Sequence, residues 1–343
     1  MVHEERHRLR AGKLPNALLS DLLERLPRKH KNLLIGPAVG VDAAAIEVSP
    51  GVLLAKSDPI TIAGREQGRL AVHVNANDIA CMGGRPKWLL VTILLPDSGE
   101  QQIEMLDEIV DELAKTCREI SVTVVGGHTE ITPAVNQPVV IGAMLGEVRA
   151  DTLLDIRKCQ PGDRLILVSG IAIEATSIIA HQCEKQLGEI FDKDLIARCQ
   201  NFSKSPGVSV LSAALLAADS GLVRAMHDPT EGGIFTALHE LCDASQCGID
   251  VQAEHIFALP ESRLLCDYFE LNIFGVISSG ALLAVSPADD AEELLAILSK
   301  HDMPAADIGA LTEHTEHRIV RTGNVDEPMP RFDQDEITRI FAL

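Results

Sequence analysis

Aromatic side chains are scarce in this sequence, at 3% of its 343 residues, with one Trp and one Tyr. Hydrophobic residues still reach 46%, which is enough for two cores of ordinary domain size. Those cores must consist mainly of Ala, Val, Ile and Leu. No stretch approaches the roughly 18 apolar residues of a membrane helix, and the first ten residues lack the apolar core of a signal peptide. We therefore expect a soluble, cytoplasmic protein without a membrane partner.

Positive charge is also in deficit, because the formal net charge is −20. A surface this acidic repels phosphodiester backbones and anionic lipids. We therefore exclude nucleic acid as a main partner. A phosphorylated small molecule is compatible with this charge, because a bound divalent cation reverses the local sign.

Several familiar motifs are missing. The eight cysteines include no CxxC pair, and the two nearest in sequence are Cys242 and Cys247. This spacing fits neither a zinc site nor a small disulfide scaffold, so we expect free thiols in a reducing cytosol. No GxxxxGK[ST] and no GxSxG occurs either, which excludes a P-loop and a nucleophile elbow.

Helical and strand patterns interleave along the whole chain, which predicts an α/β or α+β fold. The clearest helices are expected at residues 15–26, 68–82, 101–119 and 233–244, and the clearest strands at 52–56, 87–95, 139–148 and 164–168. A short β-branched strand is expected at 122–125, stopping at Gly126. A turn-rich segment at 158–163 separates two halves. We therefore expect domains at 1–150 and 151–325, followed by a tail at 326–343 that is loosely packed until about residue 337.

Four segments place acidic residues beside small ones at predicted element boundaries. They contain Asp42, Asp58, Asp78 and Glu130, the last of these within Gly126-Gly127-His128-Thr129-Glu130. Small neighbours let a phosphate or a cation approach the backbone, and Mg²⁺ prefers carboxylate and phosphate oxygens. Each segment also has a structural interpretation as a helix N-cap, a turn or a solvated helix residue.

The second half contains the segment Met226 to Gly233, which reads MHDPTEGG. Asp228 is suited to cap the following helix, with Pro229 in its first turn and Glu231 two residues later. Capping does not explain the pair Gly232-Gly233, because glycine in a first turn lowers helix stability. A close backbone approach to a ligand or to another strand would explain it.

Two histidines are further candidates. His73 lies in an apolar stretch and is expected to be a packed residue. His128 follows two glycines and is more suited to face a site, where a histidine can orient an acceptor or serve in acid–base chemistry.

Taken in order, the motifs GxDAA, SD, NxNDIAxMGxxP, GGxT, DPTxGG and SSGALL resemble the superfamily of aminoimidazole ribonucleotide synthetase. That superfamily also contains thiamine-monophosphate kinase, selenophosphate synthetase and a hydrogenase-maturation branch. The resemblance runs from about residue 36 to residue 320, and DPTxGG is most like the hydrogenase-maturation branch.

The resemblance implies a PurM-like two-domain subunit with a C-terminal α+β domain. The N-terminal sheets of two subunits would form a shared barrel in a homodimer, with ATP and Mg²⁺ bound near the interface. The apolar strands 52–56 and 87–95 are expected to need such a partner, with Trp88 near the contact. The implied reaction transfers the γ-phosphoryl group of ATP to a substrate oxygen, mainly by positioning groups and neutralising charge.

Residue roles follow by matching motifs. The expected metal ligands are Asp42, Asp58, Asp78 and Glu231. The expected nucleotide-binding residues are Asn75, Asn77, Gly126, Gly127, Thr129 and Asp228. The expected catalytic residues are His128, Glu130 and Lys13, where Glu130 is an alternative metal ligand and Lys13 reaches a phosphate or is simply solvated.

Three departures from the family pattern affect these expectations. Val41 and His128 each stand where relatives often have Asp, so fewer metal ions are expected. The hydrogenase-maturation branch ends in a cysteine that carries a carbamoyl group, whereas the last cysteine here is Cys266. We therefore expect the acceptor to be a free small molecule or a separate protein. The alternatives are an ATP-binding regulator without catalysis and a structural member of a larger complex.

Overall fold

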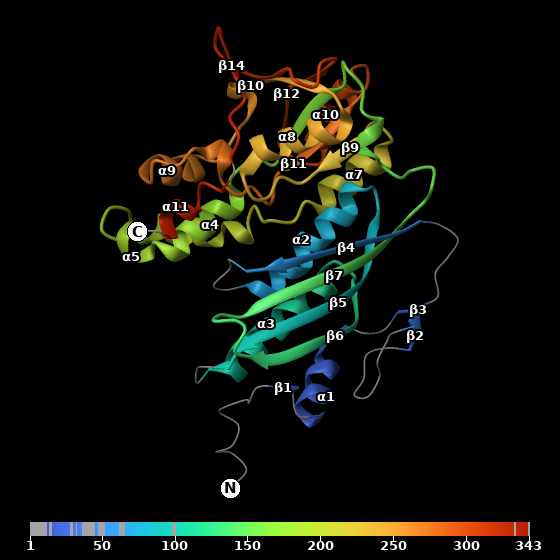
Figure 1. Ribbon diagram of the computed structural model, residues 1–343, viewed down its shortest axis with the longest axis vertical. Helices are drawn as coiled ribbons and strands as arrows, with labels where there is room; N and C mark the ends of the chain where they lie inside the picture. The colour runs from blue at the N-terminus through green and yellow to red at the C-terminus, as the bar shows by residue number, and fades with distance from the viewer. Residues whose placement is uncertain are drawn as a thin grey trace. The chain divides into compact units, whose positions relative to one another are not determined.

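The computed structural model describes residues 12–13, 16–27, 30–31, 33–35, 45–46, 52–61, 66–97, 101–332 and 334–341 (Figure 1). The chain divides into two units. Unit 1 comprises Met1–Ile79 and Gly84–Asp151, and unit 2 comprises Ala80–Gly83 and Thr152–Leu343. Among the described residues, no helix has the length and apolar character required to cross a bilayer.

Unit 1 is built on a five-stranded sheet of order β1-β6-β5-β7-β4. The strands are β1 (Gly12–Lys13), β4 (Val52–Ile60), β5 (Arg85–Pro96), β6 (Thr123–Thr132) and β7 (Val139–Val148). Only the β5–β6 pair is parallel among these described strands. Two short strands, β2 (Leu33–Ile35) and β3 (Ala45–Ile46), form a separate pair.

Three helices accompany this sheet, namely α1 (Asn16–Arg25), α2 (Gln67–Cys81) and α3 (Gln102–Glu119). Figure 1 shows α2 and α3 on the same side of the strands. The helix α3 is amphipathic, and its buried stripe includes Leu106, Ile109 and Leu113 at helical spacing. Arg25 of α1 pairs with Asp107 of α3 at 2.9 Å, so α1 packs on α3.

The opposite face of the unit 1 sheet carries apolar side chains without a covering helix among the described residues of unit 1. Along β7 the side chains alternate strictly between buried and half-buried, as expected when the two faces of a sheet differ. The outward apolar residues are Leu53, Ala55, Pro59, Leu90, Leu94, Val139, Ile141, Ala143 and Leu145. Hereafter this surface is called the open face.

Unit 2 is built on a seven-stranded sheet of order β14-β13-β10-β12-β8-β11-β9. Its strands are β8 (Arg164–Val168), β9 (Ala225–His227), β10 (Gly248–Gln252), β11 (Leu282–Ser286), β12 (Ala305–Thr312), β13 (Arg318–Thr322) and β14 (Val325–Pro328). The helices are α4 (Ile173–Gln182), α5 (Glu184–Leu187), α6 (Lys193–Gln200), α7 (Leu211–Ser220), α8 (Gly233–Ser245), α9 (Pro260–Tyr268), α10 (Ala291–Lys300) and α11 (Thr338–Phe341). Single 3₁₀ turns lie at Ile156–Lys158, Asn201–Ser203, Ala253–His255 and Ile273–Gly275.

Both faces of the central strands of unit 2 are buried. Leu165, Leu167 and Leu283 pack with residues of α8 in one cluster. Ile166 and Leu282 point to the other face and pack with residues of α7 and α10. A third cluster joins α4, α6 and α9 to the end of the described chain. All five residues of β11 are buried as a result.

Most predicted elements are confirmed to within a few residues, but two predicted strands were too short. The strand predicted at 52–56 continues through Asp58 to Ile60, because pairing with β7 persists to that point. Pro59 is tolerated because β4 is the last strand in the sheet order. The short strand predicted to stop at Gly126 instead runs to Thr132.

Other expectations also change. Trp88 is fully buried and its ring meets His30 edge-on, with 5.5 Å between centroids, so its side chain is not itself a contact surface, while its nearness to a subunit contact stays a prediction. The strand β5 that contains it is internal to the sheet rather than an edge. The tail is expected to pack loosely before Ile337, yet Met329 is already buried, and from Ile337 onward the expected packing is present.

Candidate functional site

Two of the predicted metal ligands lie together in unit 1. Asp58 is on β4 and Asp78 is near the end of α2, and Lys56 contacts both. Its Nζ lies 3.0 Å from Asp58 Oδ2 and 3.4 Å from Asp78 Oδ1. Lys56 and Asp58 are two residues apart on one strand, so they share a face of the sheet. Burial lowers the pKa of Lys56, but the nearby Asp78 and Asp58 carboxylates outweigh it and leave that pKa raised.

Asn75 holds this arrangement in place. Its side chain is fully buried, and its Oδ1 accepts a hydrogen bond of 2.9 Å from the Asp58 backbone N–H. Its Nδ2 donates to the backbone carbonyls of Asp58 and Ala71 at 3.3 and 2.9 Å. A side chain at Gly142 would come within 2.5 Å of this Nδ2. Asn75 therefore fastens α2 to β4 and fixes the Asp58 backbone, and its amide is already engaged within the protein.

The segment Gly126 to Glu130 forms the middle and later part of β6 rather than a loop. His128 pairs with Thr92, which lies between the open-face residues Leu90 and Leu94. His128 Nε2 lies 3.7 Å from Glu130 Oε2, and both side chains are about half exposed. Asp58 instead aligns with Gly142, beneath Asn75. Within one chain, the pair His128–Glu130 and the pair Asp58–Asp78 therefore lie on opposite faces of the sheet.

The two glycines of this segment differ. A side chain at Gly127 would overlap the Val91 carbonyl oxygen, whereas one at Gly126 would meet only Leu90 Cδ2 at 3.8 Å. Close packing of β6 on β5 thus accounts for Gly127 without a ligand. Packing does not account for Gly126.

In unit 2, the segment Asp228 to Gly233 connects β9 to α8. Asp228 is buried and its Oδ1 accepts a hydrogen bond from Cys81 Sγ at 3.6 Å. Asp228 does not cap α8, because the N-cap residue is Gly232, which has φ of +74°. The interpretation of Asp228 as a cap is therefore wrong. Glu231 is exposed, so its carboxylate is accessible to a ligand that approaches from solvent.

The glycine pair is explained by a close backbone approach. Gly233 has φ of +66°, and a side chain there would lie 2.5 Å from the Phe274 carbonyl oxygen. Only glycine combines this conformation with this contact.

The remaining predicted residues are placed as follows. Asn77 is fully buried, and Thr129 is half-buried on β6. The Lys13 backbone pairs with Glu130 across β1 and β6. Asp42 lies outside the described residues. Among the residues that the structure describes, no three His, Cys, Asp or Glu side chains are grouped to hold a metal ion.

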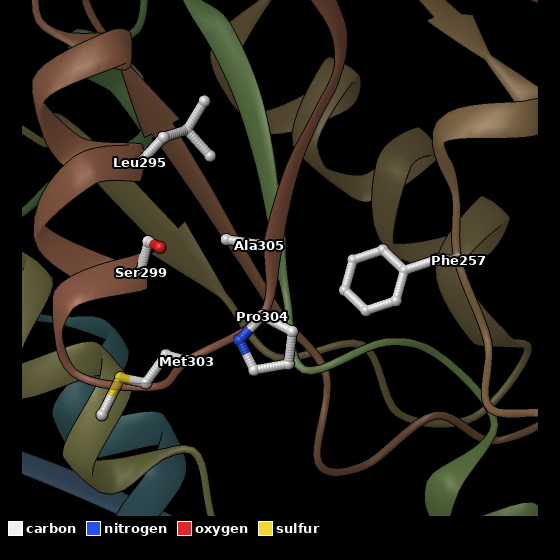
Figure 2. Close-up of a pocket in the computed structure, with 6 residues that line it drawn as sticks. All are labelled: Phe257, Leu295, Ser299, Met303, Pro304 and Ala305. Atoms are coloured by element: carbon white, nitrogen blue, oxygen red, sulfur yellow. The ribbon is translucent and has the colours of Figure 1, made fainter.

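Two hollows in unit 2 are lined by fewer charged side chains than the Asp58–Asp78 site. One measures about 450 Å³ and is lined by Phe257, Leu295, Ser299, Met303, Pro304 and Ala305, whose side chains are drawn in Figure 2. None of these side chains titrates near neutral pH. The other measures about 300 Å³ and is mainly apolar, with His227 and Glu240 at its wall, 2.9 Å apart. Sequence reasoning missed this pair because 13 residues separate its members.

Comparison with known proteins identifies the family. The N-terminal domain of AIR synthase related proteins matches residues 40–148, and the C-terminal domain matches residues 160–321. The chain belongs to the AIR synthase related protein family. It is 31% identical over 289 residues to carbamoyl dehydratase HypE of Azotobacter vinelandii, covering 82% of this chain and 81% of the relative.

Solved structures show the same two-domain α/β fold. One is HypE in complex with ATP, with a TM-score of 0.74 and 22% identity, covering 95% of this chain and 97% of that one. Another is HypE in a complex with HypF, with a TM-score of 0.70 and 20% identity, covering 85% and 93%. The PurM-like fold expected from the motifs is thereby confirmed, whereas a barrel between two subunits stays a prediction.

Proposed function

We propose that this protein is an ATP-dependent phosphoryl-transfer enzyme of the HypE-like type. The observation that carries the proposal is the Asp58–Asp78 pair, which Asn75 holds between β4 and α2. A fold shared with a HypE structure containing ATP supports the nucleotide assignment. Asp58 and Asp78 would bind the metal that neutralises the triphosphate, together with Asp42. The γ-phosphoryl group would pass to an acceptor oxygen.

The donor set suits one Mg²⁺ ion when a nucleotide is present. Magnesium takes one or two carboxylates and completes its shell with phosphate oxygens and water. The two aspartates supply those carboxylates, and Lys56 supplies a positive charge that phosphate oxygens also attract. When bound, the metal would neutralise charge on the transferred group. Lys56 must then turn from the aspartates toward the phosphates.

Calorimetry with Mg-ATP, with and without EDTA, tests this assignment. We expect EDTA to abolish binding, because uncompensated carboxylates repel the triphosphate. Asp58→Asn and Asp78→Asn should each weaken binding strongly, whereas Asp289→Asn, an equal charge change on the surface of unit 2, should not. Unchanged affinity in both site variants would rule out the metal assignment.

A second candidate is an ATP-binding regulator without catalysis. The observation that favours it is Lys56, whose ammonium group already occupies the position between the two carboxylates. ATP turnover measured with a panel of small acceptors separates the two functions. If neither turnover nor a nucleotide-induced thermal shift is found, the protein is a structural member of a complex, because a ligand specific for the native state must stabilise it.

We further propose that the acceptor is a separate molecule, and not a cysteine of this chain. Burial raises the pKa of Cys117, Cys159 and Cys266 to about 12 each. It also raises the pKa of Cys199 and Cys242 to about 11. These thiols are therefore protonated at neutral pH and are poor nucleophiles. Intact-mass spectrometry after incubation with ATP, carbamoyl phosphate and the carbamoyl-transfer partner should show no ATP-dependent adduct on any of the eight cysteines.

The open face supports a homodimer. Nine apolar residues on a sheet face make a patch of the kind that marks an interaction site, and a twofold contact would bury it against its own copy. His128 and Glu130 lie on this same face, so they would be near the interface.

A further inference from the structure

The segment 334–341 is tied to unit 2 at several points. Ile337 is fully buried, and Ile340 is nearly so, in the cluster formed by α4, α6 and α9. Arg339 Nη1 donates to the Glu270 carbonyl at 3.0 Å. Glu336 accepts a hydrogen bond from the Asn272 backbone N–H at 3.0 Å, and its own N–H donates to the Gly275 carbonyl at 3.1 Å. These contacts dock the segment on the body of the unit.

Asp335 connects this docked segment to the loop 228–233. The Gly232 backbone N–H donates to Asp335 Oδ2 at 2.7 Å, and the Ile337 N–H donates to Asp335 Oδ1 at 2.9 Å. Each oxygen of one carboxylate therefore has its own donor. One donor belongs to the segment itself, and the other belongs to a loop 103 residues earlier in the chain.

The loop needs such a partner because of how α8 begins. The first turn of a helix has N–H groups without intrahelical acceptors, and a capping side chain normally accepts from them. The N-cap residue of α8 is Gly232, which has no side chain and makes no side-chain cap. Asp335 supplies a carboxylate at this helix start, where negative charge is favoured.

The surroundings indicate a permanent contact and not a place for an exchangeable anion. Burial raises the pKa of Asp335, while hydrogen bonds from the Ile337, Gly232 and Ile277 backbone N–H groups lower it, and the charge of Glu231 raises it again. A second anion would be repelled by Glu231. The carboxylate is also held by a segment whose isoleucines are buried, so leaving would expose apolar surface.

We propose that residues 334–341 form a clasp that holds the loop 228–233 in its binding conformation, with Asp335 as the positioning residue. The loop contains Asp228 and Glu231, which the family resemblance assigns to nucleotide and metal binding. The expected change in ATP affinity therefore rests on the proposed function, whereas the expected change in the loop itself does not. Asp335 itself contacts no ligand in this scheme.

The test compares Asp335→Asn with Asp267→Asn. Both remove one carboxylate charge from unit 2, but Asp267 is exposed on α9. An asparagine at 335 must present its NH₂ group to at least one of these N–H donors, so a hydrogen bond is lost. Hydrogen exchange of the peptide covering 229–236 and calorimetric binding of Mg-ATP are measured well below the melting temperature. Ile340→Ala, which loosens the far end of the clasp, is the second variant.

We expect Asp335→Asn to accelerate exchange in 229–236 by about tenfold, the size of one lost hydrogen bond to a charged group. Mg-ATP affinity should fall by a similar factor, roughly tenfold, because the loop is no longer fixed. Ile340→Ala should show both effects in weaker form, and Asp267→Asn should show neither. A purely structural role would lower the melting temperature without changing Mg-ATP affinity.

Three results would overturn the proposal. Unchanged exchange in 229–236 would show that Asp335 does not hold the loop. Faster exchange with unchanged Mg-ATP affinity would show that the loop position does not matter for binding. Tighter Mg-ATP binding would show that Asp335 competes with the nucleotide. If the unaltered protein does not bind Mg-ATP at all, the proposed function fails, while the exchange result still decides whether the clasp exists.

Discussion

The sheets of the two units differ in how their faces are buried. In unit 2, all five residues of β11 and four of the five in β8 are buried, because helices cover both faces. In unit 1, β7 alternates between buried and half-buried residues over its whole length. Four of its five half-buried side chains are nevertheless apolar, including Ile141 and Leu145, and the fifth is Glu147. The described part of unit 2 covers both faces of its sheet, whereas the described part of unit 1 leaves the open face without a helix, and this is the face that we propose for the dimer contact.

The largest expected effect comes from placing a charge on the open face. Leu90→Asp should raise the dissociation constant of the dimer by roughly a thousandfold, about 4 kcal/mol, because an unpaired carboxylate would be buried in an apolar contact. Light scattering should then report 37.0 kDa, the mass of one chain, instead of twice that value. Leu264→Asp changes a similarly exposed leucine in unit 2 and should leave the mass unchanged. A monomeric unaltered protein at micromolar concentration would contradict the prediction.

A smaller effect separates the two glycines of β6. Gly127→Ala should lower the free energy of unfolding by about 3 kcal/mol, because the new methyl group would overlap the Val91 carbonyl. Gly126→Ala should change it by less than about 1 kcal/mol, since the site is open. Urea unfolding of both variants measures this difference. Equal losses would mean that β6 does not pack on β5 as described.

The last expected effect, at most comparable to that of Gly127→Ala, concerns buried histidines. Burial, aided by Arg69, lowers the pKa of His73 in unit 1 from 6.5 to about 4. The unfolded chain therefore takes up a proton before the folded one as the pH falls from 6.5 to 4. Folding stability is lost over that window, by no more than about 3 kcal/mol in total.

Replacing His73 with Leu should flatten this loss between pH 6.5 and 4, as measured by urea unfolding at several pH values. The corresponding buried residue in unit 2 is His239, whose pKa is also lowered by burial. Its ring contacts the Pro330 carbonyl and Arg318. His239→Leu should therefore reduce stability at every pH, since those partners lose a hydrogen bond. If the unfolding free energy of His73→Leu depends on pH as steeply as that of the unaltered protein, the lowered pKa of His73 is contradicted.

Much of this fold could be predicted from periodicity, and the exceptions have physical causes. The helix α3 was evident because its apolar residues recur on one face. The strand β4 was cut short because Ser57-Asp58-Pro59 has the composition of a turn, and only pairing with β7 extends it. The short strand β9 has too few residues for a pattern.

The candidate site was less predictable than the fold. Motif order identified Asp58 and Asp78, whose proximity depends on how α2 crosses β4. Lys56 carries no motif signal, although it contacts both carboxylates. The link between Gly232 and Asp335 joins residues 103 positions apart, and local sequence contains nothing that predicts such a contact.

The composition of unit 2 has a consequence for the order in which the protein folds. Residues Ala80–Gly83 belong to this unit, and Ala80 and Cys81 lie in its core beside Ile166 and Leu282. During synthesis, this short piece leaves the ribosome well before the rest of the unit, which begins at Thr152. To form that core, Ala80 and Cys81 must meet residues beyond Thr152, and the chain between them forms a long loop. Closing such a loop slows folding. Unit 2 expressed from residue 152 onward would lack Ala80 and Cys81 of its own core. A cut before residue 152 therefore does not divide the chain into two complete domains.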